Sequence, residues 1–234
     1  MSTAANSQSI AAPFGAMLPL APAALSTPPG VPPRSPSVLR QIATVEPYRL
    51  SVAQFEQMIQ SGVLTKYDRC ELVRGELIEK MTLGDHHMAA MNRLVRLFKR
   101  VRDDEALMSV QQAVKLRDSR PEPDLKLLVP REDCYETQTA GPPDVLLLIE
   151  VADSSLSYDR EVKLPLYAEN GIREYWIVNL IDGCIEVYRQ PQGSDYAERL
   201  MIRRGESVSP LALPALTVAA ADILGLAVTA ETAG

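Results

Sequence analysis

The segment that most constrains the fold runs from Val145 to Val151, with the sequence Val-Leu-Leu-Leu-Ile-Glu-Val. A short, almost continuous apolar run of this kind is typical of a strand covered on both faces by helices. Glu150 is then an anion at a position where such a strand favours Val or Leu. A buried carboxylate without a partner is costly or takes up a proton, whereas a nearby cation or metal ion reverses the cost. We therefore expect Glu150 to have a cationic partner.

Two candidate partners lie close to this strand in the sequence. Asp124 begins a second apolar run, residues 125–129, and Lys163 follows the Glu150 strand in a helix-like segment. Two carboxylates at strand ends and a lysine form a constellation suited to a divalent cation and an activated water. The sequence therefore predicts Mg²⁺ or Mn²⁺ bound by Asp124 and Glu150, with Lys163 orienting or deprotonating the water.

A second lysine competes for this role. Asp124-Leu125-Lys126 is a literal D-x-K motif, and side chains two residues apart share one face of a strand. Lys126 is therefore an alternative to Lys163. A third interpretation is that these residues form only a structural ion-pair cluster.

The remaining periodicity and turn signals predict a mixed α/β fold. The expected elements are a helix from Ser51 to Gly62, a hairpin over residues 71–81 around Arg74-Gly75, a helix over 86–102, a strand over 109–116, a helix over 160–170, a hairpin of 174–178 with 184–188, and a strand or loop plus a short helix over 210–226. Pro165 is tolerable only in the first turn of its helix, which would place Lys163 at the helix entrance.

Two further residues are supporting catalytic candidates. His87 lies at the start of its helix, on the apolar stripe that contains Met91 and Leu94. A histidine in such a position is usually a hydrogen-bonded core residue. Glu76 belongs to the first hairpin, where two interpretations of Glu71 and Glu76 stand equally: both are solvated strand carboxylates, or one of them has a role near the metal.

Composition excludes several classes of protein. A formal charge of -6 argues against tight non-specific binding of nucleic acid by the whole surface, although a local basic patch is compatible with it. The three cysteines are far apart, which disfavours a disulfide framework or a zinc knuckle and favours a reducing compartment, the cytoplasm. No apolar run reaches about 18 residues, so we expect no membrane partner.

The order and spacing of the motifs resemble the PD-(D/E)XK nuclease superfamily, and more closely its Uma-two group of restriction endonucleases. The resemblance covers about residues 67–224. It rests on Glu71-Leu-Val-Arg-Gly75-Glu76, on His87 before its helix, on Pro123-Asp124, on Pro143-Asp144 with Glu150-Val151, on Lys163-Leu-Pro-Leu-Tyr167-Ala168, and on Gly171-Ile-Arg-Glu-Tyr-Trp-Ile-Val178.

The resemblance implies a restriction-endonuclease-like mixed sheet flanked by helices, with an N-terminal β-hairpin. It also implies Asp124 and Glu150 as metal ligands and DNA as substrate, and it is compatible with a homodimer without specifying the oligomeric state. The chain departs from the superfamily pattern at Ala152, where a lysine would stand, which implies that Lys163 has taken over its role. The alternatives are a catalytically inactive nuclease-like domain that binds nucleic acid or protein, and a metal-dependent hydrolase of another substrate.

Residues 1–40 are predicted to form a disordered Pro/Ala-rich tail, ahead of a nuclease domain at 41–230. They carry eight of the 18 prolines and almost no charge, and lack the apolar periodicity of a core. Removing residues 1–40 is therefore expected to leave the melting temperature of the domain unchanged. Hydrogen exchange provides the check, because amide protection in the tail comparable to that of residues 145–151 would make it part of the fold.

Overall fold

The computed structural model describes residues 47–65 and 67–225. The contacts divide the chain into two units, Met1–Pro47 and Tyr48–Gly234, and all described residues except Pro47 belong to the second unit. The predicted tail, residues 1–40, lies outside the described residues. Within the described ranges, no helix has the length and apolar character needed to cross a bilayer.

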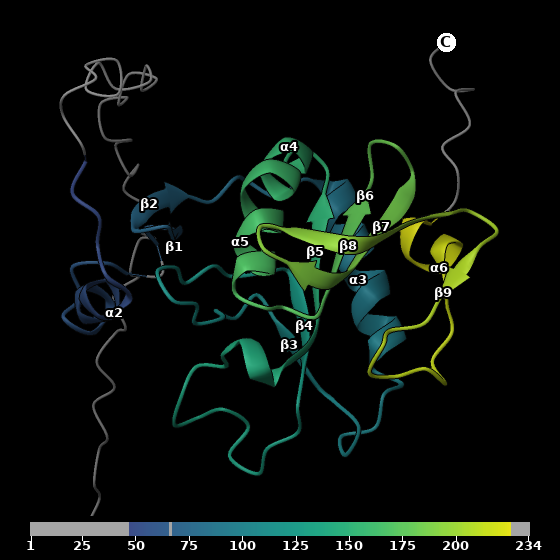
Figure 1. The fold of residues 1–234 in the computed structure, drawn as a ribbon, viewed down its shortest axis with the longest axis horizontal. Helices are drawn as coiled ribbons and strands as arrows, with labels where there is room; N and C mark the ends of the chain where they lie inside the picture. Colours follow the sequence, from purple (N-terminus) through teal and green to yellow (C-terminus); the bar gives the residue numbers. More distant parts are fainter. Residues whose placement is uncertain (1–46, 66, 226–234) are drawn as a thin grey trace, which may run out of the picture. The chain divides into compact units, whose positions relative to one another are not determined.

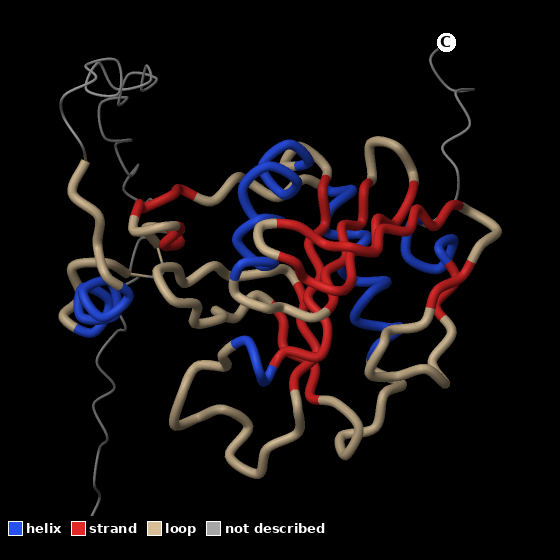
Figure 2. Tube along the Cα trace, in the orientation of Figure 1, coloured by secondary structure: helices blue, strands red, loops and turns tan. Residues whose placement is uncertain are grey.

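A six-stranded mixed sheet forms the centre of the fold, with strand order β3-β4-β5-β6-β7-β8 (Figures 1 and 2). Its strands are β3 (Leu107–Val110), β4 (Leu125–Leu128), β5 (Val145–Ala152), β6 (Glu174–Asn179), β7 (Cys184–Gln192) and β8 (Asp195–Arg203). All neighbouring strands run antiparallel except β5 and β6, which are parallel. A parallel pair needs a crossover connection, and the helical segment between β5 and β6 provides it.

The prediction for the central strand is confirmed, because β5 lies inside the sheet and is buried on both faces. Leu147, Ile149 and Val151 pack in one apolar cluster and Leu148 packs in another. The first cluster includes α3 (Asp85–Phe98) and α6 (Ala220–Leu224), and the second includes α5 (Leu164–Glu169). The two faces of the sheet are thus covered by different helices, and Glu150 belongs to the face covered by α5.

Two small sheets and several helical pieces complete the described fold. The elements are α2 (Val52–Gln60), the hairpin β1 (Cys70–Val73) and β2 (Glu76–Glu79), the 3-10 turn η1 (Pro142–Asp144), α4 (Leu156–Tyr158), the π turn η2 (Asp159–Lys163), and the pair β9 (Ser207–Val208) and β10 (Val218–Ala219). Ser51 is the N-cap of α2, as predicted, and its side chain accepts a hydrogen bond from the Gln54 amide in a capping box.

The N-terminal hairpin is confirmed, and its turn requires glycine. Gly75 has a φ of +78°, and a Cβ atom there would lie 2.8 Å from the Arg49 Cβ. The hairpin is fastened to the rest of the fold by a β-bridge, in which the Arg120 amide donates to the Leu72 carbonyl at 2.7 Å. This contact brings Glu71, the neighbour of Leu72, toward the central sheet.

Several predicted boundaries are wrong, including the end of the helix predicted over 86–102, which lies at Phe98. The strand predicted over 109–116 is Leu107–Val110, because the backbone of Gln111 adopts a φ of +49° that ends the extended run. The helix predicted over 160–170 starts earlier, at Leu156, and passes through a π turn before Pro165. Pro165 lies in the first turn of α5 and Lys163 directly precedes that helix, as predicted, although the π turn continues the helical path on its N-terminal side. Strand β8, which the sequence did not predict, is largely exposed.

Candidate active site

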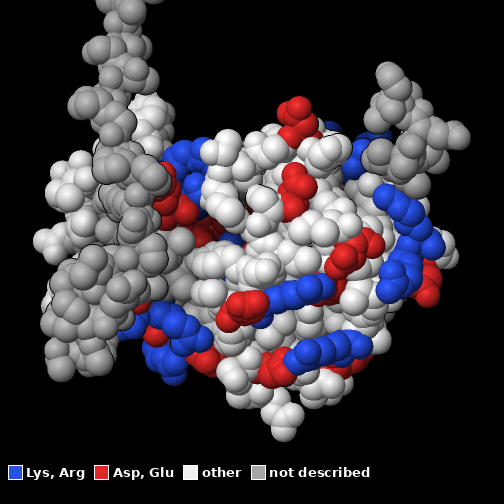
Figure 3. Space-filling model, turned by 90° about the horizontal axis from the view of Figure 1, so that it is seen from above, with Lys and Arg blue, Asp and Glu red and all other residues white. Residues whose placement is uncertain are grey.

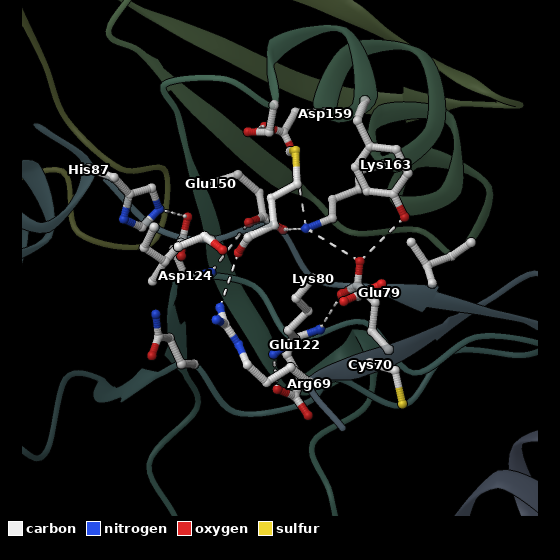
Figure 4. Close-up of a pocket in the computed structure, with 18 of the residues that line it drawn as sticks. Arg69, Cys70, Glu79, Lys80, His87, Glu122, Asp124, Glu150, Asp159 and Lys163 are labelled. Carbon is white, nitrogen blue, oxygen red and sulfur yellow. Dashed lines mark hydrogen bonds and ion pairs between the residues drawn. The ribbon is translucent and has the colours of Figure 1, made fainter. Parts of the chain in front are cut away.

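A cavity of about 720 Å³ lies beside the C-terminal end of β5 and is lined by side chains from the sheet, from the hairpin, from α2, α3 and α4, and from the π turn η2. Four of the five predicted site residues line it, namely Asp124, Glu150, Lys163 and His87. Figure 4 shows them converging, with His87 and Asp124 on one side of Glu150 and Lys163 on the other. Glu76 does not line the cavity.

Glu150 is the centre of the cluster and is only 3% exposed. Its Oε1 accepts hydrogen bonds from Lys163 Nζ and from the Tyr167 hydroxyl, both at 2.8 Å. Its Oε2 accepts a longer bond, 3.4 Å, from the Asp124 amide. The expected cationic partner of Glu150 is thus Lys163.

Asp124 is placed opposite Glu150 by the pairing of β4 with β5, in which Leu125 faces Ile149. Its Oδ2 accepts a hydrogen bond of 2.8 Å from the Val151 amide and lies 2.9 Å from Nε2 of His87. The Nδ1 atom of His87 is buried and has no hydrogen-bond partner among the described residues. His87 therefore orients Asp124 directly.

Lys163 is surrounded by three carboxylates. Its Nζ lies 2.8 Å from Glu150, 3.8 Å from Glu71 and 4.0 Å from Asp159. Burial alone would lower the pKa of Lys163, but the carboxylates, Glu150 foremost, raise it above its usual value. One ammonium thus faces three acidic groups, so the cluster holds an excess of negative charge.

Burial and the excess of negative charge also raise the pKa values of two carboxyl groups in the cluster. Burial raises the pKa of Glu150 to about 8 against the lowering effect of Lys163, and the charges of Asp124 and Asp159 add to the rise. Burial likewise raises the pKa of Asp159 to about 6, while Lys163 opposes the rise. A divalent cation at this site would offset both the burial of these carboxyl groups and the repulsion between them, the two causes that raise their pKa values.

The oxygen atoms present fit a magnesium ion that keeps much of its water. In the part of the chain that the structure describes, no group of three or more His, Cys, Asp or Glu side chains could hold a metal ion. Mg²⁺ is, however, commonly bound through one or two carboxylates plus waters and substrate phosphate. The hydrogen bonds concentrate on Oδ2 of Asp124 and Oε1 of Glu150, which makes Oδ1 and Oε2 the atoms suited to an ion.

Of the hairpin residues Glu71 and Glu76, Glu71 lines the cavity, whereas Glu76, the predicted site residue, does not. Glu76 lies 3.3 Å from Arg49 and its side chain is 24% exposed. Glu71 is only 4% exposed because the docked hairpin turns it inward, so of the two interpretations left open for these two glutamates, solvation does not hold for Glu71. The Glu71 carboxylate accepts hydrogen bonds from the Tyr158 hydroxyl at 3.3 Å and the Glu122 amide at 3.1 Å.

Sequence reasoning also missed Asp159 and Tyr167. Both lie four residues from Lys163, and this spacing of four was the available signal. Lys126, by contrast, is 1% exposed and donates from Nζ to the Gln112 carbonyl at 2.5 Å. Burial lowers its pKa to about 8, with Glu122 opposing the change, and Lys126 does not line the cavity. Of the two rival lysines, the structure brings Lys163 to Glu150.

Comparisons with known proteins agree with this fold. The chain matches the model of the Uma2 family, described as "Putative restriction endonuclease", over residues 52–223. Its structure is similar to the crystal structure of a "putative nuclease belonging to DUF820" from Anabaena variabilis ATCC 29413, with a TM-score of 0.59 and 17% identity, covering 75% of this chain and 97% of that one. That likeness shows the fold alone. No curated protein matches the chain. Because the family model spans well over half of the sequence, the chain belongs to the Uma2 family.

Proposed function

We propose that this protein is a DNA endonuclease that hydrolyses phosphodiester bonds with the help of Mg²⁺ or Mn²⁺. The observation that carries the proposal is the cluster at the end of β5, where two buried carboxylates, Asp124 and Glu150, meet Lys163 in an open cavity. Membership of the Uma2 family supports it. The excess negative charge of the cluster favours a divalent cation, and a bound cation in turn favours a phosphate substrate.

Asp124 and Glu150 would hold the ion, which when bound supplies a polarised phosphate and a water of lowered pKa. His87 and the Val151 amide fix the orientation of Asp124, while Lys163 and Tyr167 fix that of Glu150. The three acidic groups around Lys163 favour its charged form. We therefore assign Lys163 to orienting the attacking water and to stabilising charge on the phosphate, rather than to removing the proton.

The charged surface is compatible with a local rather than a general contact with DNA. The face seen in Figure 3 carries acidic and basic side chains interspersed. A continuous basic surface would be expected of a protein that binds nucleic acid non-specifically. This face therefore gives no support to a general electrostatic contact, and we expect binding to depend on the cavity and its metal.

A second candidate function is a catalytically inactive nuclease-like domain that binds nucleic acid or protein. It is favoured by the way Lys163 and Tyr167 already satisfy Oε1 of Glu150, and by the lack of a three-ligand metal group in the described ranges. Such a domain would bind its partner without any dependence on divalent cations.

The experiment that tests the proposal is a cleavage assay on duplex, single-stranded and branched DNA. Wild-type protein and Glu150→Gln are compared in Mg²⁺, Mn²⁺ and EDTA. Cleavage that needs the metal and is lost in Glu150→Gln supports the endonuclease. DNA binding of equal strength with and without metal, together with no cleavage of any substrate, supports the inactive domain instead.

The hairpin offers a matched pair of variants. Glu71→Gln is expected to lower the cleavage rate about tenfold or more, because Glu71 shares Lys163 with Glu150 and positions it. Glu76→Gln is expected to leave the rate within about twofold, since its carboxylate faces Arg49 outside the cavity. Single-turnover rates at saturating Mg²⁺ give the comparison. A larger loss of cleavage rate in Glu76→Gln than in Glu71→Gln would assign the catalytic role to Glu76, the residue named from the sequence.

A further inference from the structure

The helical segment after β5 presents four polar side chains at intervals of four residues. Ser155 Oγ donates to Asp159 Oδ2 at 2.5 Å, and the Asp159 carboxylate lies 4.0 Å from Lys163 Nζ. Lys163 and Tyr167 both donate to the same oxygen of Glu150. All four side chains therefore lie along one face of the segment.

A regular α-helix would not align them. With 3.6 residues per turn, the 12 residues from Ser155 to Tyr167 make about 3.3 turns, so the two ends would point about 120° apart. The segment instead contains the π turn η2, where the Leu164 amide donates to the Asp159 carbonyl five residues back. A π turn adds one residue with almost no added rotation, which brings the total to about 3.1 turns. The π turn thus removes most of the angle that a regular α-helix would place between Ser155 and Tyr167.

Pro165 gives a physical reason for the π turn. Pro165 has no amide hydrogen, and in an α-helix its ring would clash with the Glu161 carbonyl four residues earlier. Widening the preceding turn relieves that clash, and π turns of this kind occur mostly as single insertions within α-helices.

An ion pair between the half-exposed Arg160 and the buried Glu186 contacts the outer side of the turn. Arg160, inside η2, donates to the two oxygens of Glu186 on β7 at 3.0 and 2.5 Å. Glu186 is buried and also accepts hydrogen bonds from Asn179 and Tyr188. Since Arg160 follows Asp159 directly, this bidentate pair fixes the rotation of the turn that carries Asp159 and Lys163.

We propose that Pro165 is a positioning residue: by imposing the π turn it keeps Asp159, Lys163 and Tyr167 on the face that meets Glu150, and the Arg160–Glu186 pair locks that register. The inference rests on the proposed function for its kinetic consequence. Its structural content, the dependence of the polar alignment on Pro165, stands on the contacts alone.

The test is Pro165→Ala, with Pro214→Ala, an exposed loop proline far along the chain, as the matched control. Pro165→Ala restores a backbone donor, so the segment is expected to tighten into a continuous α-helix and the melting temperature to stay equal or rise. The Lys163–Glu150 contact is expected to break in a crystal structure. The kcat for DNA cleavage should fall by a factor of about 10 to 100 with KM little changed, because misplacement affects the reacting groups rather than substrate binding.

A second pair of variants tests the lock without touching proline. Arg160→Met is expected to lower kcat in the same way, and Arg160→Lys, which keeps one charged contact with Glu186, is expected to recover part of the loss. Wild-type kcat in Pro165→Ala, or a crystal structure of that variant that retains both the π turn and the Lys163–Glu150 contact, overturns the inference. If wild type and Pro214→Ala cleave no DNA at all, the proposed function fails, and the crystal structure still decides the role of Pro165.

Discussion

Lys163→Met is expected to lower the single-turnover rate of DNA cleavage by a factor on the order of 100 or more, the usual scale for a lost electrostatic group. The reason is the position of its ammonium group, 2.8 Å from the Glu150 carboxylate inside the cavity. Lys126→Met is expected to leave the rate within about threefold, since Lys126 donates to a backbone carbonyl and does not line the cavity.

The same variants separate loss of chemistry from loss of folding. Lys163→Met leaves three neighbouring carboxylates without their shared cation, so the metal-free protein should be markedly less stable than wild type. Magnesium should restore much of that stability and bind as tightly as before or more tightly, because a positive charge has been removed near both oxygen ligands. Calorimetric titration and thermal melting measure the two effects.

An opposite pattern would reverse the assignment. If Lys126→Met abolishes cleavage while Lys163→Met stays active and binds magnesium normally, the literal Asp124-Leu125-Lys126 motif supplies the working lysine. The melting temperature of Lys126→Met gives a further control. We expect it to stay close to that of wild type, because replacing buried charge by an apolar side chain of similar volume is often neutral or stabilising.

Glu150→Gln is expected to change activity and stability in opposite directions. Cleavage should fall by about 100-fold or more, because a proposed metal ligand is lost. The metal-free protein should become more stable, because burial raises the pKa of the Glu150 carboxyl to about 8 at a cost in folding stability that a neutral amide does not carry, and Lys163 still has Glu71 and Asp159 as partners. A purely structural ion pair would behave differently, because breaking it lowers stability.

The metal itself provides the second half of this test. At a magnesium concentration ten times the Kd, ligand binding should stabilise the wild-type protein by about 1.4 kcal/mol and raise its melting temperature by about 3 to 6 °C. The shift should grow with metal concentration and vanish in Asp124→Asn/Glu150→Gln. A shift of equal size in the double variant would place the metal elsewhere.

Much of the central architecture follows from local pattern. The apolar run of β5 required burial on both faces, and Glu150 within it required a cation, whatever the rest of the chain did. The hairpin around Gly75 and the amphipathic helix that buries His87 are likewise local consequences of turn chemistry and periodicity. These features depend on residues close together in the sequence, which is why they could be predicted.

The composition of the site was decided by tertiary contacts. Glu71 and Glu76 are equivalent by local pattern, and only the bridge between Leu72 and Arg120 turns Glu71 rather than Glu76 toward Lys163. The choice between Lys163 and Lys126 depends on which ammonium reaches Glu150 across the fold. Asp159 joins the cluster because a π turn, caused by Pro165, keeps a spacing of four residues on one face. Sequence periodicity specifies which face a residue occupies, but only packing between distant segments specifies which of those faces meet.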